Sequence, residues 1–234
     1  ISIVWIEFEW NTDIFKARQI VNEKIVAISE QLPVGVGTPT MAPQASIMGE
    51  IMLVSASSRT GSMSPMALRT LVDWQIRPRL LALPGVSQVT VIGGEVRQYQ
   101  VLADPEKLWQ RNLPLSKLTE AVAQANSSTS GGFLQVGGRE SLVRNLGRIQ
   151  SLDQLKQVIV SEDKGRSVKV QDVARVIMGP RVRRGAASFN AHPAVILSIQ
   201  KQPAANTVEL SGRIEDTFAQ LRERLPDDVV LEPL

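Results

Sequence analysis

Residues 51–92 read IMLVSASSRTGSMSPMALRTLVDWQIRPRLLALPGVSQVTVI and follow a strand, helix, strand pattern. Ile51–Ala56 is a short apolar run, which is typical of a buried strand. Pro65 suits the first turn of a helix, which we expect over Leu68–Leu81 and which must end before Pro84. A second β-branched run follows. These residues therefore predict one strand-helix-strand unit.

The same pattern occurs twice more, which makes it an internal repeat. The chain begins with a β-branched and aromatic strand over 1–8, and a helical pattern then runs over 12–33. Near the C-terminus we expect a strand at 194–200, a helix over 206–226 and a last strand at 229–231. Each helix ends at Leu-Pro after an apolar strand. The repeat predicts an α+β fold of ferredoxin-like βαβ modules.

The chain between these repeats has a different composition. Gly93-Gly94 is expected to turn the chain back in a hairpin, and a further helix is expected over 114–124. Short strands and glycine-containing turns then fill 133–191. Because the strand at 194 resumes the repeat, we expect 128–192 to be a small inserted α+β subdomain.

The composition excludes most catalytic chemistry. The 234 residues contain no cysteine and one histidine, His192. Thiolate nucleophiles, cysteine zinc sites and iron–sulfur clusters are therefore excluded, as is a multi-histidine metal cage within one chain. The sequence contains no tight pair of carboxylates and no phosphate-binding glycine motif. We predict no catalytic residue, no cofactor, no metal site and no enzyme activity, and keep a hydrolase that uses Ser, Asp and His192 as the enzyme alternative.

Positive charge is slight and scattered. Lys and Arg number 26 against 23 Asp and Glu, which gives a net charge of +3. This is weak support for a nucleic-acid partner. The densest basic cluster is Arg181, Arg183 and Arg184, and alternation places Arg181 and Arg183 on one face of an extended segment. The cluster suits either a charged sheet edge that blocks strand addition or a docking patch for an acidic partner.

Several short motifs occur in an order typical of one family. They are NTDIFKARQ at 11–19, DWQIRP at 73–78, LPGV at 83–86, GG at 93–94, QYQV at 98–101, GG at 131–132, the strand pattern at 168–176 and GPRVRRG at 179–185. Together they resemble the large periplasmic loop between the first and second membrane helices of a resistance-nodulation-division efflux pump of the heavy-metal branch. The resemblance covers essentially the whole chain.

The resemblance implies four segments. Residues 1–42 resemble the C-terminal part of a first porter subdomain, and 43–127 resemble the first half of a second porter subdomain. Residues 128–192 resemble the inserted docking subdomain, and 193–234 the second half of the second porter subdomain. The mechanism implied is alternating access through rigid-body movement of the porter modules.

The resemblance also implies a proton-driven homotrimer that exports heavy-metal cations at the periplasmic face of the bacterial inner membrane. Its partners would be a periplasmic adaptor and an outer-membrane channel, with no nucleic acid, and the parent chain would be embedded in the membrane. Met48 and Met52 are candidates for the substrate path, because thioethers bind soft cations, although packing is the commoner role of methionine. The arginine cluster at 181–184 is the candidate for partner contact.

A stand-alone ferredoxin-like module that binds a ligand or RNA is the alternative. The basic pI fits an RNA partner. The aromatic residues of an RNA-binding sheet are missing, however, and GFLQVG at 132–137 matches such a motif only loosely.

Overall fold

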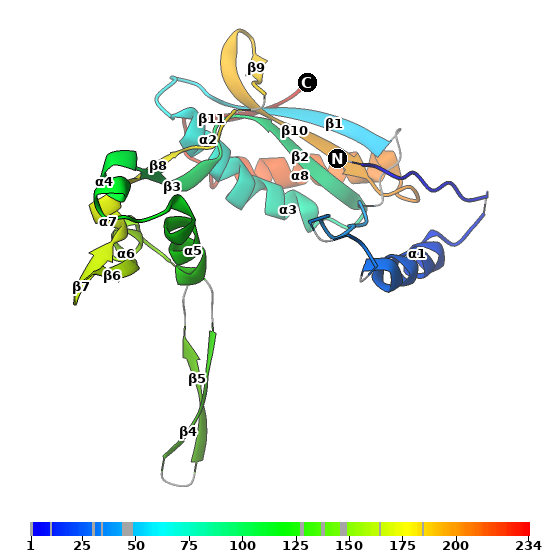
Figure 1. Cartoon of the computed structure of the whole chain (residues 1–234). Helices are drawn as coiled ribbons and strands as arrows, with labels where there is room; N and C mark the ends of the chain where they lie inside the picture. The colour runs from blue at the N-terminus through cyan, green and yellow to red at the C-terminus, as the bar shows by residue number, and fades with distance from the viewer. Residues whose placement is uncertain are drawn as a thin grey trace.

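The computed structural model divides the chain into two main units, which Figure 1 shows joined by a narrow neck. It describes residues 2–9, 11–29, 31–33, 35–43, 49–126, 129–136, 139–145, 149–163, 165–183 and 185–234, with only the backbone of 129–136, 139–145 and 163. One unit is a helix-covered sheet, and the other is a smaller α+β unit from which a long hairpin projects (Figure 1).

The larger unit is built on an antiparallel sheet. Its strands are β1 (Glu50–Ser58), β2 (Val86–Gly93), β10 (His192–Lys201) and β11 (Val229–Pro233), in the order β11-β1-β10-β2. The short strand β9 (Ser188–Phe189) pairs with the start of β10. β2 and β10, the second and third of these strands in the chain, thus lie side by side. β1, the first, lies between β10 and β11. This is the ferredoxin-like order, and it confirms the predicted α+β fold.

The first crossover helix is interrupted by a wider turn. It consists of α2 (Pro65–Leu71), a π-helical turn η2 (Val72–Ile76) and α3 (Arg77–Leu81). Ser64 caps its start with a side-chain oxygen, as is common for serine. Pro78 has no amide hydrogen, and its ring would clash with the carbonyl four residues earlier in a regular α-helix. The π turn accommodates this proline.

The second crossover helix closes the main core. It is α8 (Thr207–Arg222), which Asn206 caps by accepting from the next two free backbone amides. Its buried residues recur at helical spacing and face the sheet. The residues of this core are Val54, Ala56, Leu68, Val72, Ile76, Leu80, Val86, Val89, Val195, Leu197, Ile199, Leu210, Ile214, Phe218, Leu221, Leu225, Val229 and Leu231.

The smaller unit has its own core. Strands β3 (Arg97–Ala103) and β8 (Ala174–Pro180) form an antiparallel ribbon at its base. Its other elements are α4 (Pro105–Gln110), α5 (Leu115–Ala125), β4 (Thr129–Val136), β5 (Arg139–Asn145), α6 (Leu152–Lys156), β6 (Ile159–Asp163), β7 (Arg166–Lys169) and α7 (Val170–Val173). The buried residues are Leu108, Leu118, Leu155, Val168, Val170, Val173, Ala174 and Val176. No buried residue is shared with the main core among those described.

This second core begins earlier in the chain than 128, where the sequence placed the start of the insert. Helices α4 and α5 contribute Leu108 and Leu118 to it, and β3 contributes the partly buried Val101. Among the described residues, the packing therefore changes near Arg97. The sequence could not show this, because the helical pattern of α5 looks the same whichever core it packs on.

The expected hairpin at Gly93-Gly94 is wrong. Strand β2 pairs with β10, and β3 pairs with β8, so the chain passes here from one unit to the other. Both glycines have positive φ, which glycine adopts without strain. A Cβ at Gly93 would also lie 2.6 Å from the Cβ of Ala187. The two glycines allow a sharp turn at which Gly93 lies close to Ala187. In sequence, such a turn looks the same as a hairpin turn.

The expected strand at 1–8 is also wrong for its described part. Residues 2–9 belong to no strand, and Ile3, Val4 and Trp5 are largely exposed. A β-branched run forms a ladder only when a neighbouring strand supplies hydrogen-bond partners, and no described residue does so here. The helix that follows, α1 (Ile14–Ser29), forms as predicted. In the part of the chain that the structure covers, no helix is long and apolar enough to cross a bilayer.

Candidate functional site

The described residues 94–96, 181–183 and 185–187 form the neck between the units. The backbone N–H of Arg181 donates to the carbonyl oxygen of Val96 at 2.8 Å. Further from the ribbon of β3 and β8, the guanidinium of Arg183 forms an ion pair with Glu95. Glu95 is mostly buried, with 14% of its side chain exposed, whereas 65% of the Arg183 side chain is exposed. A backbone hydrogen bond and an ion pair thus join the segments 94–96 and 181–183.

The start of the neck is also anchored to the first crossover helix. Arg69 on α2 donates through Nη1 to the carbonyl oxygen of Gly93 at 2.6 Å and through Nε to Asp73 at 2.8 Å. The side chain of Arg69 is only 16% exposed. A charge-assisted bond at a half-buried site is stronger than one in open water. Arg69 therefore fixes where the chain leaves the sheet.

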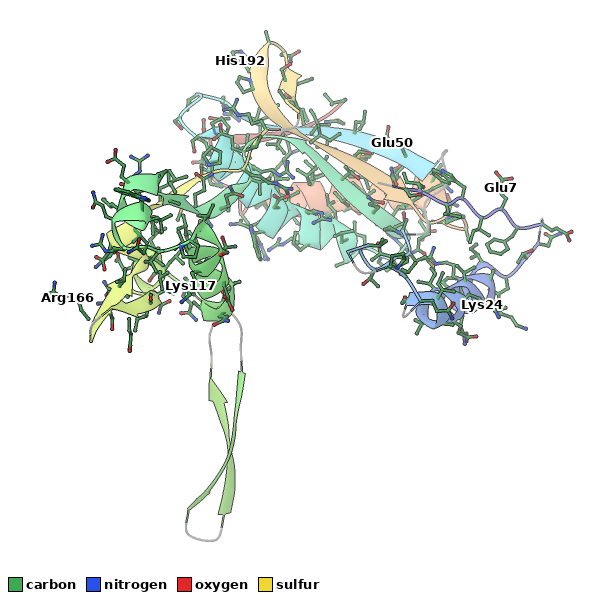
Figure 2. All side chains as sticks on the ribbon, in the orientation of Figure 1. Glu7, Lys24, Glu50, Lys117, Arg166 and His192 are labelled. Atoms are coloured by element: carbon green, nitrogen blue, oxygen red, sulfur yellow. The ribbon has the colours of Figure 1, made fainter. Side chains whose placement is uncertain are left out.

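A cavity of about 390 Å³ lies beside the neck. Its walls come from the loop that follows β1, from the neck and from the start of β10. Met63, Leu68 and Val195 form apolar walls, and Arg59 and His192 also line it. His192 is exposed and lies at the start of β10, beside β9 (Figure 2). Separate parts of the chain thus converge on this cavity.

Asp228 holds the loop that forms one wall of this cavity. Its carboxylate accepts from the hydroxyls of Ser58 and Ser62 and from both the backbone N–H and the hydroxyl of Thr60. The hydrogen bond from the Ser58 hydroxyl, followed by those from Thr60, holds the pKa of Asp228 well below its usual range. No functional role for this aspartate was predicted from the sequence. A Ser-x-Thr-x-Ser pattern after a strand was the signal that could have revealed its donors.

The turn between β9 and β10 leads into the start of β10, which lines the cavity. Asn190 and Ala191 both have positive φ, 49° and 64°, which is the backbone of a type I′ hairpin turn. Glycine normally occupies the second position, so the sequence did not predict this hairpin. Ala191 adopts a conformation that is strained for a residue with a Cβ.

The arginine cluster lies partly at the neck. Arg181 and Arg183 both line a second cavity of about 300 Å³ on β2, and Val182 between them lines it too, so the shared face of the two arginines remains a prediction. Arg183 also lines the larger cavity. Arg184 lies outside the described residues. Sequence reasoning missed Glu95, which partners Arg183 from 88 positions away.

Of the two methionines proposed for a substrate path, Met48 lies outside the described residues. Met52 is partly buried on β1 and packs against the main core. It lines a small cavity with Phe218 and Leu231. Its neighbours are those of a packing residue, and a role in a substrate path remains a prediction.

Ser58, Asp228 and His192 do not form a hydrolytic relay in the described part of the chain. Such a relay needs a serine hydroxyl that donates to histidine, but Ser58 donates to Asp228 instead. No hydrogen bond links Ser58 to His192, although both line the same cavity. Within the described ranges, no group of three or more His, Asp or Glu side chains could hold a metal ion.

Comparison with known proteins identifies a family to which this chain is similar. The family model described as the AcrB/AcrD/AcrF family matches residues 1–234. The chain is 30% identical to Protein HelA of Legionella pneumophila and to the cobalt-zinc-cadmium resistance protein CzcA of Cupriavidus metallidurans, each over 98% of its length. It is 31% identical over 97% of its length to the cation efflux system protein CusA of Escherichia coli K12. The chain spans about 22% of the length of these relatives.

A solved structure with a similar fold is also that of a metal efflux protein. An X-ray crystal structure of a heavy metal efflux pump superposes with a TM-score of 0.80 and 27% identity, over 97% of this chain and 22% of that one. The resemblance to the heavy-metal branch of the resistance-nodulation-division pumps is thereby confirmed. The chain belongs to the AcrB/AcrD/AcrF family.

Proposed function

We propose that this chain is the periplasmic porter and docking segment of a longer, proton-driven pump that exports heavy-metal cations. One observation carries the proposal: the ferredoxin-like sheet and its inserted unit superpose, as one chain, on a heavy metal efflux pump. The names of the relatives support metal cations as the substrate class, since one is a cobalt-zinc-cadmium resistance protein. The chain acts mechanically, as a body that moves and binds, and no catalytic step is assigned to it.

The two cores support a division of labour within the segment. We assign 43–96 and 181–234 to the second porter subdomain and 97–180 to the docking subdomain, since the described residues of each range share one core. Residues 1–42 belong to a first porter subdomain. Separate cores joined by a neck allow the porter sheet to move as a rigid body while the docking unit stays in place.

The shape of the docking unit supports the proposed partners. The hairpin of β4 and β5 projects far from both cores (Figure 1). A projecting two-stranded ribbon is marginal alone in water and gains stability by packing on another surface. The proposal assigns it to contact with a neighbouring subunit of a homotrimer. The remainder of the docking unit and the arginines of the neck would face a periplasmic adaptor, which in turn leads to an outer-membrane channel.

Compartment labelling of the full-length parent protein tests this proposal. The chain contains no cysteine, so Arg166→Cys, at an exposed position labelled in Figure 2, provides a single reporter thiol once any others in the parent are replaced. A maleimide that cannot cross the inner membrane should label it in spheroplasts. Labelling only after lysis would place the segment in the cytoplasm and overturn the proposal. The flanking sequence should contain one apolar run of roughly 20 residues upstream and several downstream.

A further inference from the structure

The cavity beside the neck has the dimensions of a small-molecule site. Its volume of about 390 Å³ falls within the range of roughly 300–1,000 Å³ that ligand pockets occupy. Three separate segments of the chain converge on it, and two of them are fixed by hydrogen bonds: the loop at 58–62 by Asp228, and the neck by Glu95. The cavity is therefore built by ordered elements.

The inner walls of the cavity are apolar. Leu68 and Val195 are buried members of the main core, and Met63 packs against that core. Ala186 and Ala187 line the cavity from the side of the neck. A ring or a short alkyl chain would displace water from these surfaces, and such burial contributes roughly 25 cal/mol per Å². The walls therefore favour an apolar ligand body.

The described residues that line the cavity include two arginines and one carboxylate. Glu95 is the only carboxylate among its described lining residues, and Arg183 neutralises it. Arg59 is exposed at the cavity and forms no ion pair with any described residue. The nearby carboxylate of Asp228 is ionised and accepts hydrogen bonds from Ser58, Thr60 and Ser62, and it forms no ion pair with Arg59. One guanidinium thus remains available for an anion, and its planar fork matches a carboxylate.

We propose that this cavity binds a small apolar monoanion, such as an aromatic carboxylate. The apolar body lies against Leu68 and Val195, and the carboxylate is bound by Arg59. The backbone N–H of Arg59 donates to the carbonyl oxygen of Asp228 at 2.7 Å, which fixes the position from which its side chain starts. The proposed binding does not rest on metal export, and among the described residues that line the cavity no group of three or more His, Asp or Glu side chains could hold a metal ion.

Isothermal titration calorimetry of the 234-residue chain with 2-naphthoate tests the proposal. The neutral 2-naphthamide is the matched probe, because it keeps the ring and loses the charge. We expect naphthoate to bind about five- to tenfold more tightly than the amide, as one charge-assisted contact with an exposed arginine would produce. Arg59→Gln should remove that difference. Arg79→Gln, at an exposed arginine on α3 that does not line the cavity, should leave it unchanged.

A second variant tests the position of the apolar body. Ala186 is exposed and lines the cavity, so Ala186→Phe should fill its mouth and abolish binding of both probes without loss of fold. The thermal midpoint of each variant, measured in the same buffer, checks folding. Absence of naphthoate binding to the unmodified chain would overturn the proposal. Binding that survives both Arg59→Gln and Ala186→Phe in folded protein would place the ligand elsewhere and overturn it equally.

Discussion

Thr60 donates twice to the same oxygen of Asp228, from its backbone nitrogen at 2.8 Å and from its hydroxyl at 2.7 Å. The two residues are 168 positions apart. Their contact ties the loop after β1 to the turn before β11, at one edge of the sheet. Because this loop forms a wall of the cavity beside the neck, the shape of that cavity depends on a contact between the two ends of the ferredoxin-like module.

The first prediction concerns acid stability. The pKa of Asp228 is lowered in the folded chain, chiefly by the Ser58 hydroxyl. Its stabilisation is therefore fully present above the pKa of an unfolded aspartate, about 4, and is lost as pH falls toward the lower folded value. We expect Asp228→Asn to lower the thermal midpoint at neutral pH, with a difference that shrinks between about pH 5 and pH 3. Asp227→Asn, at the exposed neighbouring aspartate, is the control, and an equal effect of both would refute the assignment.

The second prediction concerns the ion pair across the neck. A double-mutant cycle with Glu95→Gln and Arg183→Gln should give a coupling free energy of about 0.2–1 kcal/mol, because Arg183 is largely exposed. The coupling should decrease as salt is added, since exposed charges are screened. Urea unfolding provides the measurement. A coupling of zero at low salt would mean that the pair does not hold the neck together.

The third prediction concerns the hairpin at the start of β10. Ala191 has a φ of 64°, so Ala191→Gly should raise the free energy of unfolding by about 1 kcal/mol through relief of backbone strain. Ala186→Gly is the control, because Ala186 does not have positive φ and glycine there only adds freedom to the unfolded chain. Stabilisation by both variants, or by neither, would argue against the strained turn.

The fourth prediction separates the two units. Ile214 belongs to the main core and Leu118 to the smaller one, and both are nearly fully buried. Each change to alanine should cost about 2–5 kcal/mol. Hydrogen exchange should show the loss in β1 and β10 for Ile214→Ala, and in β3 and β8 for Leu118→Ala, because the cores share no described residue. Uniform acceleration across both units in either variant would show that they unfold as one.

The fifth prediction concerns metal ions. Silver(I), copper(I), zinc and cobalt should leave the thermal midpoint of the 234-residue chain unchanged, since Met52 packs against the main core. A cation bound only by the folded chain would add about 2.7 kcal/mol at a concentration of 100 times its Kd. A rise of the midpoint with metal concentration that Met52→Leu removes would instead support the substrate-path role of Met52.

Local chemistry explains which elements could be predicted from sequence. The cap of the first crossover helix by Ser64 and of α8 by Asn206 follows from side-chain oxygens placed before an apolar run. The strands β1 and β10 follow from short apolar runs. These features depend on neighbours in the chain, so the sequence shows them directly.

The wrong predictions arise where contacts between residues far apart in the sequence determine the structure. Gly93 looks like a hairpin glycine, and only the pairing of β2 with β10 and of β3 with β8 shows that it lies at a crossing between units. The segment at 2–9 has the pattern of a strand but no described partner. The cavity was missed for the same reason: Asp228 and Thr60, like Glu95 and Arg183, meet only after the whole module has folded.

Metal content of cells that express the full-length parent protein tests the central claim most directly. In a bacterial strain without other metal exporters, grown with zinc, cobalt, cadmium or silver, cellular metal is measured by mass spectrometry. The account predicts a lower content of at least one of these cations than in cells with an empty vector, at equal growth. Equal content of all of them, with the protein shown to be present in the inner membrane, would contradict the claim that this segment belongs to a heavy-metal exporter.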